Sequence, residues 1–405
     1  MKNPPPPTPL AGLVGAFAFT RLILNTAYRM VYPYLSFFQN GLGVGLPAIS
    51  AVLALRSLIA FGGPFLASLA ERYGRRVSML LGMGLFTIGA LTVVVLPTYT
   101  GFAISLPLMA LAYMIFLPAM QAYLGDRVAY RRRGRVMGMT ELAWSLSFMA
   151  GVPLVGLLLA RSGAWQAPFL PLALLGGLAL IILWRLLPAD APSPAEGATP
   201  PLPAFPLGQV LRAGAARTSF LVMLLLTAAN ETVNVVFGLW LEQRFGFQLA
   251  ALGAAAVLIG LSELGGEGLS AWLVDRLGKG WSVRAGLLVN VLAAAGMVLL
   301  GGGAPGALAG LFLFYLSFEY AIVSLLPLMS ETLPQLRATV MAGTMAMGAL
   351  ERALGAQAAP LLYNEMGMSA NLLAALGMNL LAVLLVGTVQ AGAEKSMRPA
   401  ADDFA

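Results

Sequence analysis

The chain contains no cysteine and no histidine. The absence of cysteine excludes disulfide bonds, thiol catalysis and any metal site built on thiolates. The absence of histidine removes the side chain that most readily exchanges protons near neutral pH, so protons that cross this protein need another carrier. Glutamate inside a membrane is the available type, because burial favours the neutral form of a carboxyl group.

Charged residues are also scarce. They make up 10% of the 405 residues, whereas 59% are hydrophobic and the mean hydropathy is +0.84. In a soluble domain about a quarter of the residues are charged. This composition excludes a soluble protein and predicts one that is embedded in a lipid bilayer.

Sequence patterns of energy-coupling and catalytic proteins are missing as well. The chain has no G-x-x-x-x-G-K-[ST] phosphate loop and no polar stretch long enough for a nucleotide-binding domain. It has no serine-nucleophile motif and no carboxylates at metal-ligand spacing. We therefore expect no enzyme, no cofactor and no metal, and we expect an ion gradient to supply any driving force.

Apolar runs long enough to cross about 30 Å of hydrocarbon as helices recur along the whole chain. They lie at residues 10–35, 46–70, 77–97, 102–124, 136–160, 167–187, 218–241, 249–273, 284–304, 308–331, 340–363 and 370–391. We predict an all-α membrane protein of twelve transmembrane helices without a signal peptide. The predicted parts are a tail at 1–9, a six-helix half at 10–187, a proline-rich linker at 188–217, a second six-helix half at 218–391 and a tail at 392–405.

Two short stretches share a pattern at a separation of 204 residues. In each, an acid and an arginine are followed by a glycine and a base just before an apolar run. The residues concerned are Glu71, Arg72, Gly74, Arg75 and Arg76 in the first stretch and Asp275, Arg276, Gly278 and Lys279 in the second. Residues 133–151 match residues 337–355 at the same separation. One shared separation predicts a tandem duplication of a unit of about 200 residues.

Basic residues gather in alternate breaks between the apolar runs. The breaks after runs two, four, eight and ten hold most of them, and the intervening breaks hold only Arg161 and Arg244. Because Lys and Arg are retained on the cytoplasmic side, we expect a multi-pass protein of the inner (plasma) membrane with both termini and the linker in the cytoplasm. This topology accounts for the net charge of +7, so we expect no nucleic-acid partner.

Several charged residues lie inside the predicted helices. Each costs at least about 2.5 kcal/mol near the bilayer centre and should face a cavity or a partner. They are absent from every third helix, and the bases concentrate in the first copy and the acids in the second. The candidates for a substrate and proton pathway are Arg21, Asn25, Arg29, Arg56, Glu231, Asn234, Glu263, Glu267, Glu319 and Glu351. The alternative role for any of them is to hold neighbouring helices together as Arg–Glu pairs.

The paired loops resemble the signature G-x-x-x-D-R-x-G-R-R between helices 2 and 3 of the major facilitator superfamily. The departures are Ala67 and Ala271 in place of the leading glycine, and Glu71 in place of aspartate. The resemblance implies a conformational latch at the cytoplasmic face and alternating access by two six-helix halves. It also implies a small-molecule substrate with the proton as coupling ion.

A second feature points to a subgroup of that family. Gly151, Pro153 and Gly156 resemble part of the Gly-Pro motif in helix 5 of its drug and metabolite antiporters, and they should bend the helix or allow close packing. The membrane-embedded arginine that many family members carry in helix 4 is missing from residues 118–124. If protons are coupled, Arg21, Arg29 or Arg56 would have to take its place.

These features favour proton-coupled efflux of hydrophobic or cationic small molecules, because acids in a cavity suit cations and protons. One alternative is proton-coupled uptake of an anionic metabolite held by Arg21 and Arg29. Neutralising Arg21 should then abolish anion uptake and spare cation export. Another alternative is a lipid-handling or receptor-like protein without coupled transport. We expect the protein to act as a monomer in the lipid bilayer.

Overall fold

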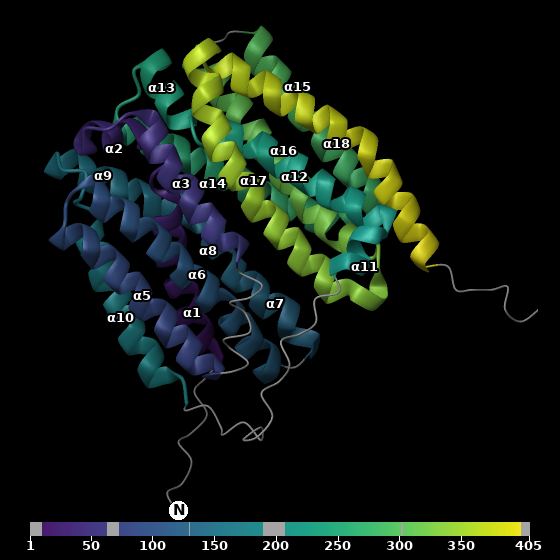
Figure 1. Ribbon diagram of the computed structural model, residues 1–405, viewed down its shortest axis with the longest axis horizontal. Coiled ribbons are helices and arrows are strands. Elements are labelled where there is room, and N and C mark those ends of the chain that lie inside the picture. The colour runs from purple at the N-terminus through teal and green to yellow at the C-terminus, as the bar shows by residue number, and fades with distance from the viewer. Residues whose placement is uncertain (1–9, 63–72, 129, 189–206, 301–302, 398–405) are drawn as a thin grey trace, which may run out of the picture. The chain divides into compact units, whose positions relative to one another are not determined.

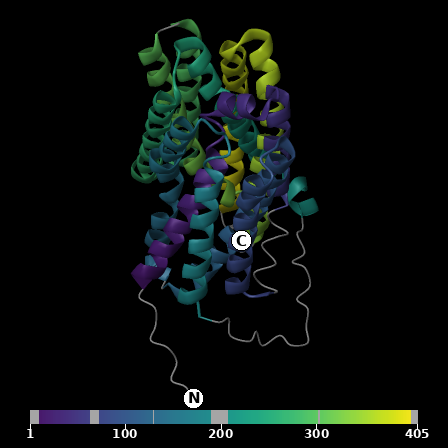
Figure 2. The ribbon, with the colours of Figure 1, turned by 90° about the vertical axis from the view of Figure 1, so that its left-hand side faces the viewer.

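The computed structural model describes residues 10–62, 73–128, 130–188, 207–300 and 303–397. Within these ranges every regular element is a helix and none is a strand (Figures 1 and 2). The predicted all-α class is therefore confirmed. Glu71 and Arg72 of the predicted latch lie outside the described residues, as do most of the predicted tails and linker.

The chain forms two compact units. The first contains the described residues of 10–31 and 73–188, and the second contains those of 32–62 and 207–397. This grouping differs from the predicted halves, because residues 32–62 belong to the first copy of the sequence but pack with helices of the second. Each unit is thus built from separated parts of the chain.

The first unit contains five long helical segments in its described residues, one of which is interrupted. Its elements are α1 Leu10–Arg29, α5 Arg75–Val95, α6 Tyr99–Arg127, α7 Tyr130–Glu141, α8 Ala143–Leu146, a π-helical turn Ser147–Gly151, α9 Val152–Ser162 and α10 Phe169–Leu186. Helix α5 packs along both α6 and α10. Glycines permit this closeness: a Cβ at Gly82 would lie 2.9 Å from the Ala112 carbonyl oxygen.

The second unit is organised around α17, which packs along both α3 and α12 (Figure 1). Helix α11 lies in the range predicted as an extended linker, and α18 continues beyond residue 391. The elements are α2 Leu35–Leu42, α3 Leu46–Phe61, α11 Leu207–Arg212, α12 Gly214–Asn234, α13 Phe237–Phe245, α14 Leu249–Leu277, α15 Lys279–Leu299, α16 Ala304–Ser330, a 3₁₀ turn Pro334–Leu336, α17 Arg337–Met366 and α18 Met368–Met397.

Each of the twelve predicted apolar runs contains a helix. In the part of the chain that the structure describes, nine helices are long and apolar enough to cross a membrane, and the pair α2–α3, bent by 112°, is a tenth candidate. Helices α1 and α17 have 20 and 30 residues and are also long enough. They are more polar than an ordinary span because they carry buried charges such as Arg21 and Glu351.

The two copies of the sequence have matching turns. Helices α5 and α15 each have 21 residues and begin 204 residues apart. The glycines before them, Gly74 and Gly278, have φ of 89° and 82°. Gly163 and Gly367, which follow the ends of α9 and α17, both have φ of 67°. Gly74 and Gly278 also agree in ψ, at 155° and 146°, whereas Gly163 and Gly367 share φ alone. The backbone conformation before α5 thus recurs before α15 at the separation that the duplication predicts.

The positive φ of Gly278 can be tested by substitution. An L-residue at φ of 82° is strained, and Gly278→Ala should lower the free energy of unfolding by about 1–2 kcal/mol. A Cβ there meets nothing within 4 Å, so the loss would come from the backbone alone.

The matched control is Gly268→Ala, at an α14 position with open space for a Cβ, which should stabilise the helix by about 0.5–1 kcal/mol. Thermal unfolding followed by tryptophan fluorescence measures both variants. Equal stability of the two would contradict a strained turn at Gly278.

Candidate functional site

Arg21 forms a two-pronged ion pair in the first unit. Its Nη1 lies 2.6 Å from Glu141 Oε1, and its Nη2 donates to Glu141 Oε2 at 2.7 Å. The Arg21 side chain is 2% exposed, whereas that of Glu141 is 47% exposed. The Nη2 contact is a charge-assisted hydrogen bond, which is stronger than a neutral one. Sequence reasoning noted an acid in helix 5 but did not include it in the pathway.

Arg29 is held by aromatic rings. Its Cζ lies 4.3 Å from the centre of the Trp144 ring and 3.4 Å from that of Phe148, and its Nη1 donates to the Trp144 carbonyl at 3.0 Å. The negative faces of aromatic rings attract a cation and stabilise it away from water. Between the two bases, Asn25 is fully buried, and its side chain makes no hydrogen bond with any described residue.

Helix 5 is irregular where the sequence predicts a bend. The π-helical turn Ser147–Gly151 lies directly before Pro153, and Gly156 lies in the regular helix α9. Proline has no backbone N–H, so it removes a helical hydrogen bond and favours such a rearrangement. Gly151 also touches Thr26, and a Cβ there would overlap that side chain. The turn therefore lies where α1 and helix 5 approach most closely.

A buried hydrogen-bond network in the second unit centres on Glu231. Tyr32 Oη donates to Glu231 Oε1 at 2.8 Å, and Asn234 Nδ2 donates to Oε2 at 3.2 Å. Arg56 Nη2 donates to Tyr32 Oη at 2.6 Å, and Tyr315 Oη donates to Asn234 Oδ1 at 3.0 Å. Arg56 and Glu231 are 1% and 2% exposed. The network joins an acid to a base through one tyrosine hydroxyl.

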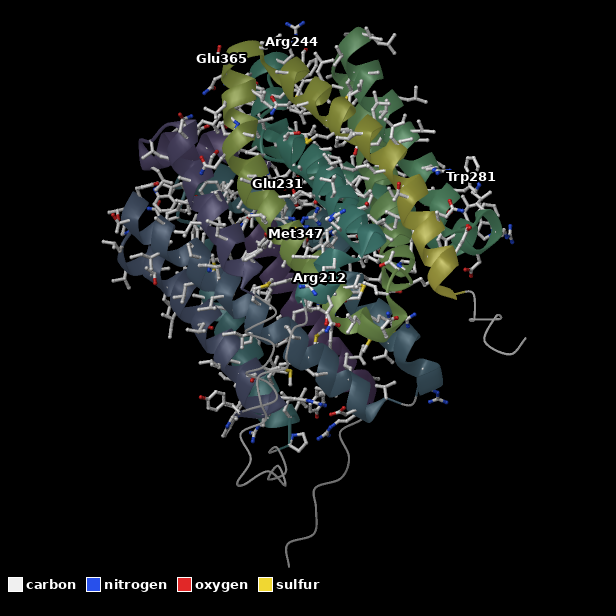
Figure 3. The ribbon with its side chains drawn as sticks, turned by 45° about the vertical axis from the view of Figure 1, so that its right-hand side comes forward. Arg212, Glu231, Arg244, Trp281, Met347 and Glu365 are labelled. Carbon is white, nitrogen blue, oxygen red and sulfur yellow. The ribbon has the colours of Figure 1, made fainter. Side chains whose placement is uncertain are left out.

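Glu231 lies deep in this unit. Figure 3 shows it among the helices, with Arg244 and Glu365 at one end and with Met347 and Arg212 on its other side. Depth along the spanning direction matters, because a charge costs most near the middle of the bilayer.

Glu351 on α17 is a second buried acid in this unit. It is 0% exposed, and neither of its carboxyl oxygens accepts a hydrogen bond from a described residue. It interacts electrostatically with Glu231 and lies beside Thr227. Its nearest cation is Arg352, whose Nε lies 3.8 Å from Oε1. Two carboxyl groups therefore share the place where α12 crosses α17.

Gly355 sets the distance between these two helices. A Cβ at this position would lie 2.9 Å from Glu231 Cβ and 3.1 Å from its Cγ. Gly355→Ala should therefore displace Glu231, lower the free energy of unfolding by about 1–3 kcal/mol and weaken ion-coupled transport.

Gly348→Ala is the control, because a Cβ there would make an ordinary 3.5 Å contact with Met223 on the same pair of helices. Thermal unfolding and transport assays measure both variants. If the two variants have the same stability and the same transport rate, the close approach of Gly355 to Glu231 does not matter for transport.

Three further predicted acids lie at another crossing. Glu319 on α16 packs against α14, since a Cβ at Gly266 would lie 2.8 Å from Glu319 Cβ. Glu263 and Glu267 are on α14 itself, the former 3% exposed and the latter partly exposed. The described residues contain no group of three or more His, Cys, Asp or Glu side chains placed to hold a metal.

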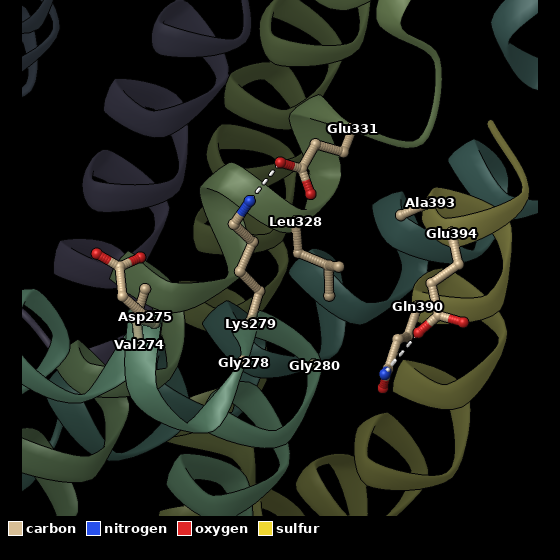
Figure 4. Close-up of a pocket in the computed structure, with 10 residues that line it drawn as sticks. All are labelled: Val274, Asp275, Gly278, Lys279, Gly280, Leu328, Glu331, Gln390, Ala393 and Glu394. Carbon is tan, nitrogen blue, oxygen red and sulfur yellow. Dashed lines mark hydrogen bonds and ion pairs between the residues drawn. The ribbon is translucent and has the colours of Figure 1, made fainter. Parts of the chain in front are cut away.

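The predicted latch loops contact neighbouring helix ends within their own units. Arg75 pairs with Asp126 at the end of α6, and Lys279 pairs with Glu331 just after α16 (Figure 4). Arg76 Nη2 donates to the Trp184 carbonyl at 2.9 Å. The Arg276 guanidinium lies over the Trp272 ring at 4.6 Å.

A cavity of about 310 Å³ adjoins the Lys279–Glu331 pair. Its lining residues are Val274, Asp275, Gly278, Lys279, Gly280, Leu328, Glu331, Gln390, Ala393 and Glu394 (Figure 4).

Sequence reasoning did not foresee the roles of Tyr32 and Tyr315. A helical stripe through residue 32 follows from the predicted run 10–35, but α1 ends at Arg29 and Tyr32 lies in the turn that follows. The turn redirects the tyrosine toward Glu231. The only signal in the sequence is that Tyr32 and Tyr315 are polar-tipped aromatics inside apolar runs, where a hydroxyl needs a partner.

A family model described as Major Facilitator Superfamily matches residues 17–356. The MFS-type transporter YwfA of Bacillus subtilis is 38% identical over 97 residues, which is 24% of each chain. The MFS-type transporter YbcL of the same bacterium is 21% identical over 82% of this chain and 85% of the relative.

Two solved structures share the fold. The human organic anion transporter MFSD10 (TETRAN) has a TM-score of 0.66 at 20% identity and covers 93% of this chain and 99% of its own. The nucleoside transporter NupG has a TM-score of 0.72 at 13% identity and covers 94% and 99%. The family model spans most of the sequence, and the chain belongs to the Major Facilitator Superfamily of membrane transporters.

Proposed function

We propose that this transporter exports hydrophobic or cationic small molecules in exchange for protons, by alternating access. It would do so as a monomer in the inner (plasma) membrane, with both termini in the cytoplasm. Membrane transport follows from the family, whereas the coupling ion, the direction and the substrate class are proposed. The observation that carries the proposal is the buried pair of carboxyl groups, Glu231 and Glu351, in the second unit.

The surroundings of Glu351 favour a proton as the coupling ion. An ionised carboxylate without hydrogen-bond donors in an apolar interior costs several kcal/mol, and a bound proton removes that cost. A second carboxyl group nearby adds to it, because two like charges at one site oppose each other.

The charge balance supports a cationic or neutral substrate. Glu141 neutralises Arg21, and aromatic rings cover Arg29. The acids of the second copy remain the larger set of membrane charges.

Uptake of an anionic metabolite is the competing proposal, and the likeness to an organic anion transporter supports it. The nucleoside transporter has the higher TM-score, 0.72 against 0.66, and its name gives a different substrate. We therefore base the choice of substrate class on the groups that contact Arg21 and Arg29, and not on the similarity to either transporter.

Proteoliposomes with an imposed pH gradient test this function. Fluorescent lipophilic cations should accumulate only when the gradient is present, and a protonophore should abolish the accumulation. Accumulation of organic anions in place of cations would favour the competing proposal. A dye flux that is the same with and without the pH gradient would favour a protein of this fold without coupled transport.

A further inference from the structure

We propose that the transported proton resides on Glu351, whereas Glu231 stays ionised and is held by Tyr32 and Asn234. This assignment rests on the proposed proton coupling and specifies which atom carries the ion. It follows from the hydrogen bonds around the two carboxyl groups.

Both oxygens of Glu231 accept hydrogen bonds. Tyr32 has one hydroxyl hydrogen, and because its oxygen accepts from Arg56 Nη2, that hydrogen is donated to Glu231 Oε1. The amide nitrogen of Asn234 can only donate, so Oε2 is also an acceptor. A group that accepts at both oxygens fits a carboxylate. The positive charge of Arg56 is linked to Glu231 through the Tyr32 hydroxyl and balances the negative charge of the carboxylate.

Glu351 has the opposite surroundings. The Arg352 Nε at 3.8 Å is too far for a hydrogen bond. The Thr227 hydroxyl donates its hydrogen to the Met223 carbonyl at 2.6 Å, and neither carboxyl oxygen of Glu351 accepts a hydrogen bond from a described residue. A buried carboxyl group without such bonds suits the neutral acid better than the ionised carboxylate. Among the described residues, the charged groups that act on Glu351 are Glu231 and Arg352.

The duplication shows that this acid pair occurs once in the chain. The positions 204 residues before Glu231 and Glu351 are Ala27 and Ser147, which cannot carry a proton at neutral pH. The equivalent crossing in the first unit, where α1 meets Gly151 at Thr26, therefore has no carboxyl group at these two positions. The site accordingly binds one proton for each chain.

Infrared difference spectroscopy on the full-length protein in membranes tests the assignment. The C=O band of a protonated carboxyl group should be lost in Glu351→Gln and kept in Glu231→Gln. Glu365→Gln, at an exposed position on the same helix, is the control and should leave the band unchanged. Loss of the band in Glu231→Gln and its retention in Glu351→Gln would overturn the assignment.

A Tyr32→Phe variant keeps the ring and removes the donor to Glu231. In the Tyr32→Phe, Glu351→Gln double variant, Glu231 should take up the proton, so the band that Glu351→Gln lacks should return. Its continued absence would contradict the role of Tyr32. Thermal unfolding of each variant checks that the fold is kept.

The spectra need neither substrate nor gradient, which separates this inference from the proposed function. If the C=O band belongs to Glu351 but the protein shows no gradient-driven transport, the proposed function is refuted and the assignment of the proton to Glu351 stands. Gradient-driven transport by a protein whose carboxyl band belongs to Glu231 would support the proposed function and refute the assignment to Glu351.

Discussion

Replacing Glu351 by glutamine should abolish accumulation of a cation against its gradient and leave exchange of that cation between equal pools intact. Glutamine has nearly the same shape as the neutral acid, so the helices should pack as before. It cannot release a proton, however, and the gradient then has no group on which to act. Coupling free energies between two ligands typically change an affinity about 5–150-fold, and the effect of pH on cation affinity should be lost in this variant.

Two measurements on the same preparation separate coupling from folding. Counterflow exchange at equal pH on both sides reports whether the site still binds and moves substrate. Glu365→Gln on the same helix should match the wild type in both assays. Gradient-driven accumulation by Glu351→Gln at the wild-type rate would contradict a coupling role for this residue.

Removing the acid of the Arg21–Glu141 pair should destabilise the protein far more than removing the base. Glu141→Gln leaves the Arg21 guanidinium, 2% exposed, without its counter-charge. Breaking a buried pair in this way costs about 3–5 kcal/mol. Arg21→Met leaves only Glu141, which is 47% exposed and which water still reaches, so the loss should be about 0–1 kcal/mol beyond side-chain packing.

Thermal unfolding in detergent, followed through the six tryptophans of the chain, measures both losses. The double variant should recover much of the stability lost by Glu141→Gln, since the Arg21 guanidinium is then no longer buried without its counter-charge. If the two single variants lose equal stability and the double variant regains none, the buried charge of Arg21 is not the cause of the destabilisation.

Helix positions could be predicted from the sequence because they depend on local properties. An apolar run of about 20 residues spans the hydrocarbon as a helix whatever its neighbours are. The turns at Gly74 and Gly278 were also predictable, because residues with positive φ are nearly always glycine and the two lie in matching motifs.

The pairing of the charges was not predictable, because it depends on how helices approach in three dimensions. Arg21 was predicted as a pathway residue, but its partner Glu141 lies 120 residues away in the same copy. Likewise, Glu231 was predicted as a pathway residue, yet its link to Arg56 depends on a turn that ends α1 at Arg29. The grouping of α3 with α17 depends on packing in the same way.

The most direct test of coupling through the acid pair is to count the protons that the purified protein releases when it binds a transported cation. In weakly buffered detergent solution, binding should release about one proton per chain, because proton and cation affinities are linked. Glu351→Gln should bind the cation and release none. Equal release from Glu351→Gln and the wild type would contradict the account, since the proton would then come from another group.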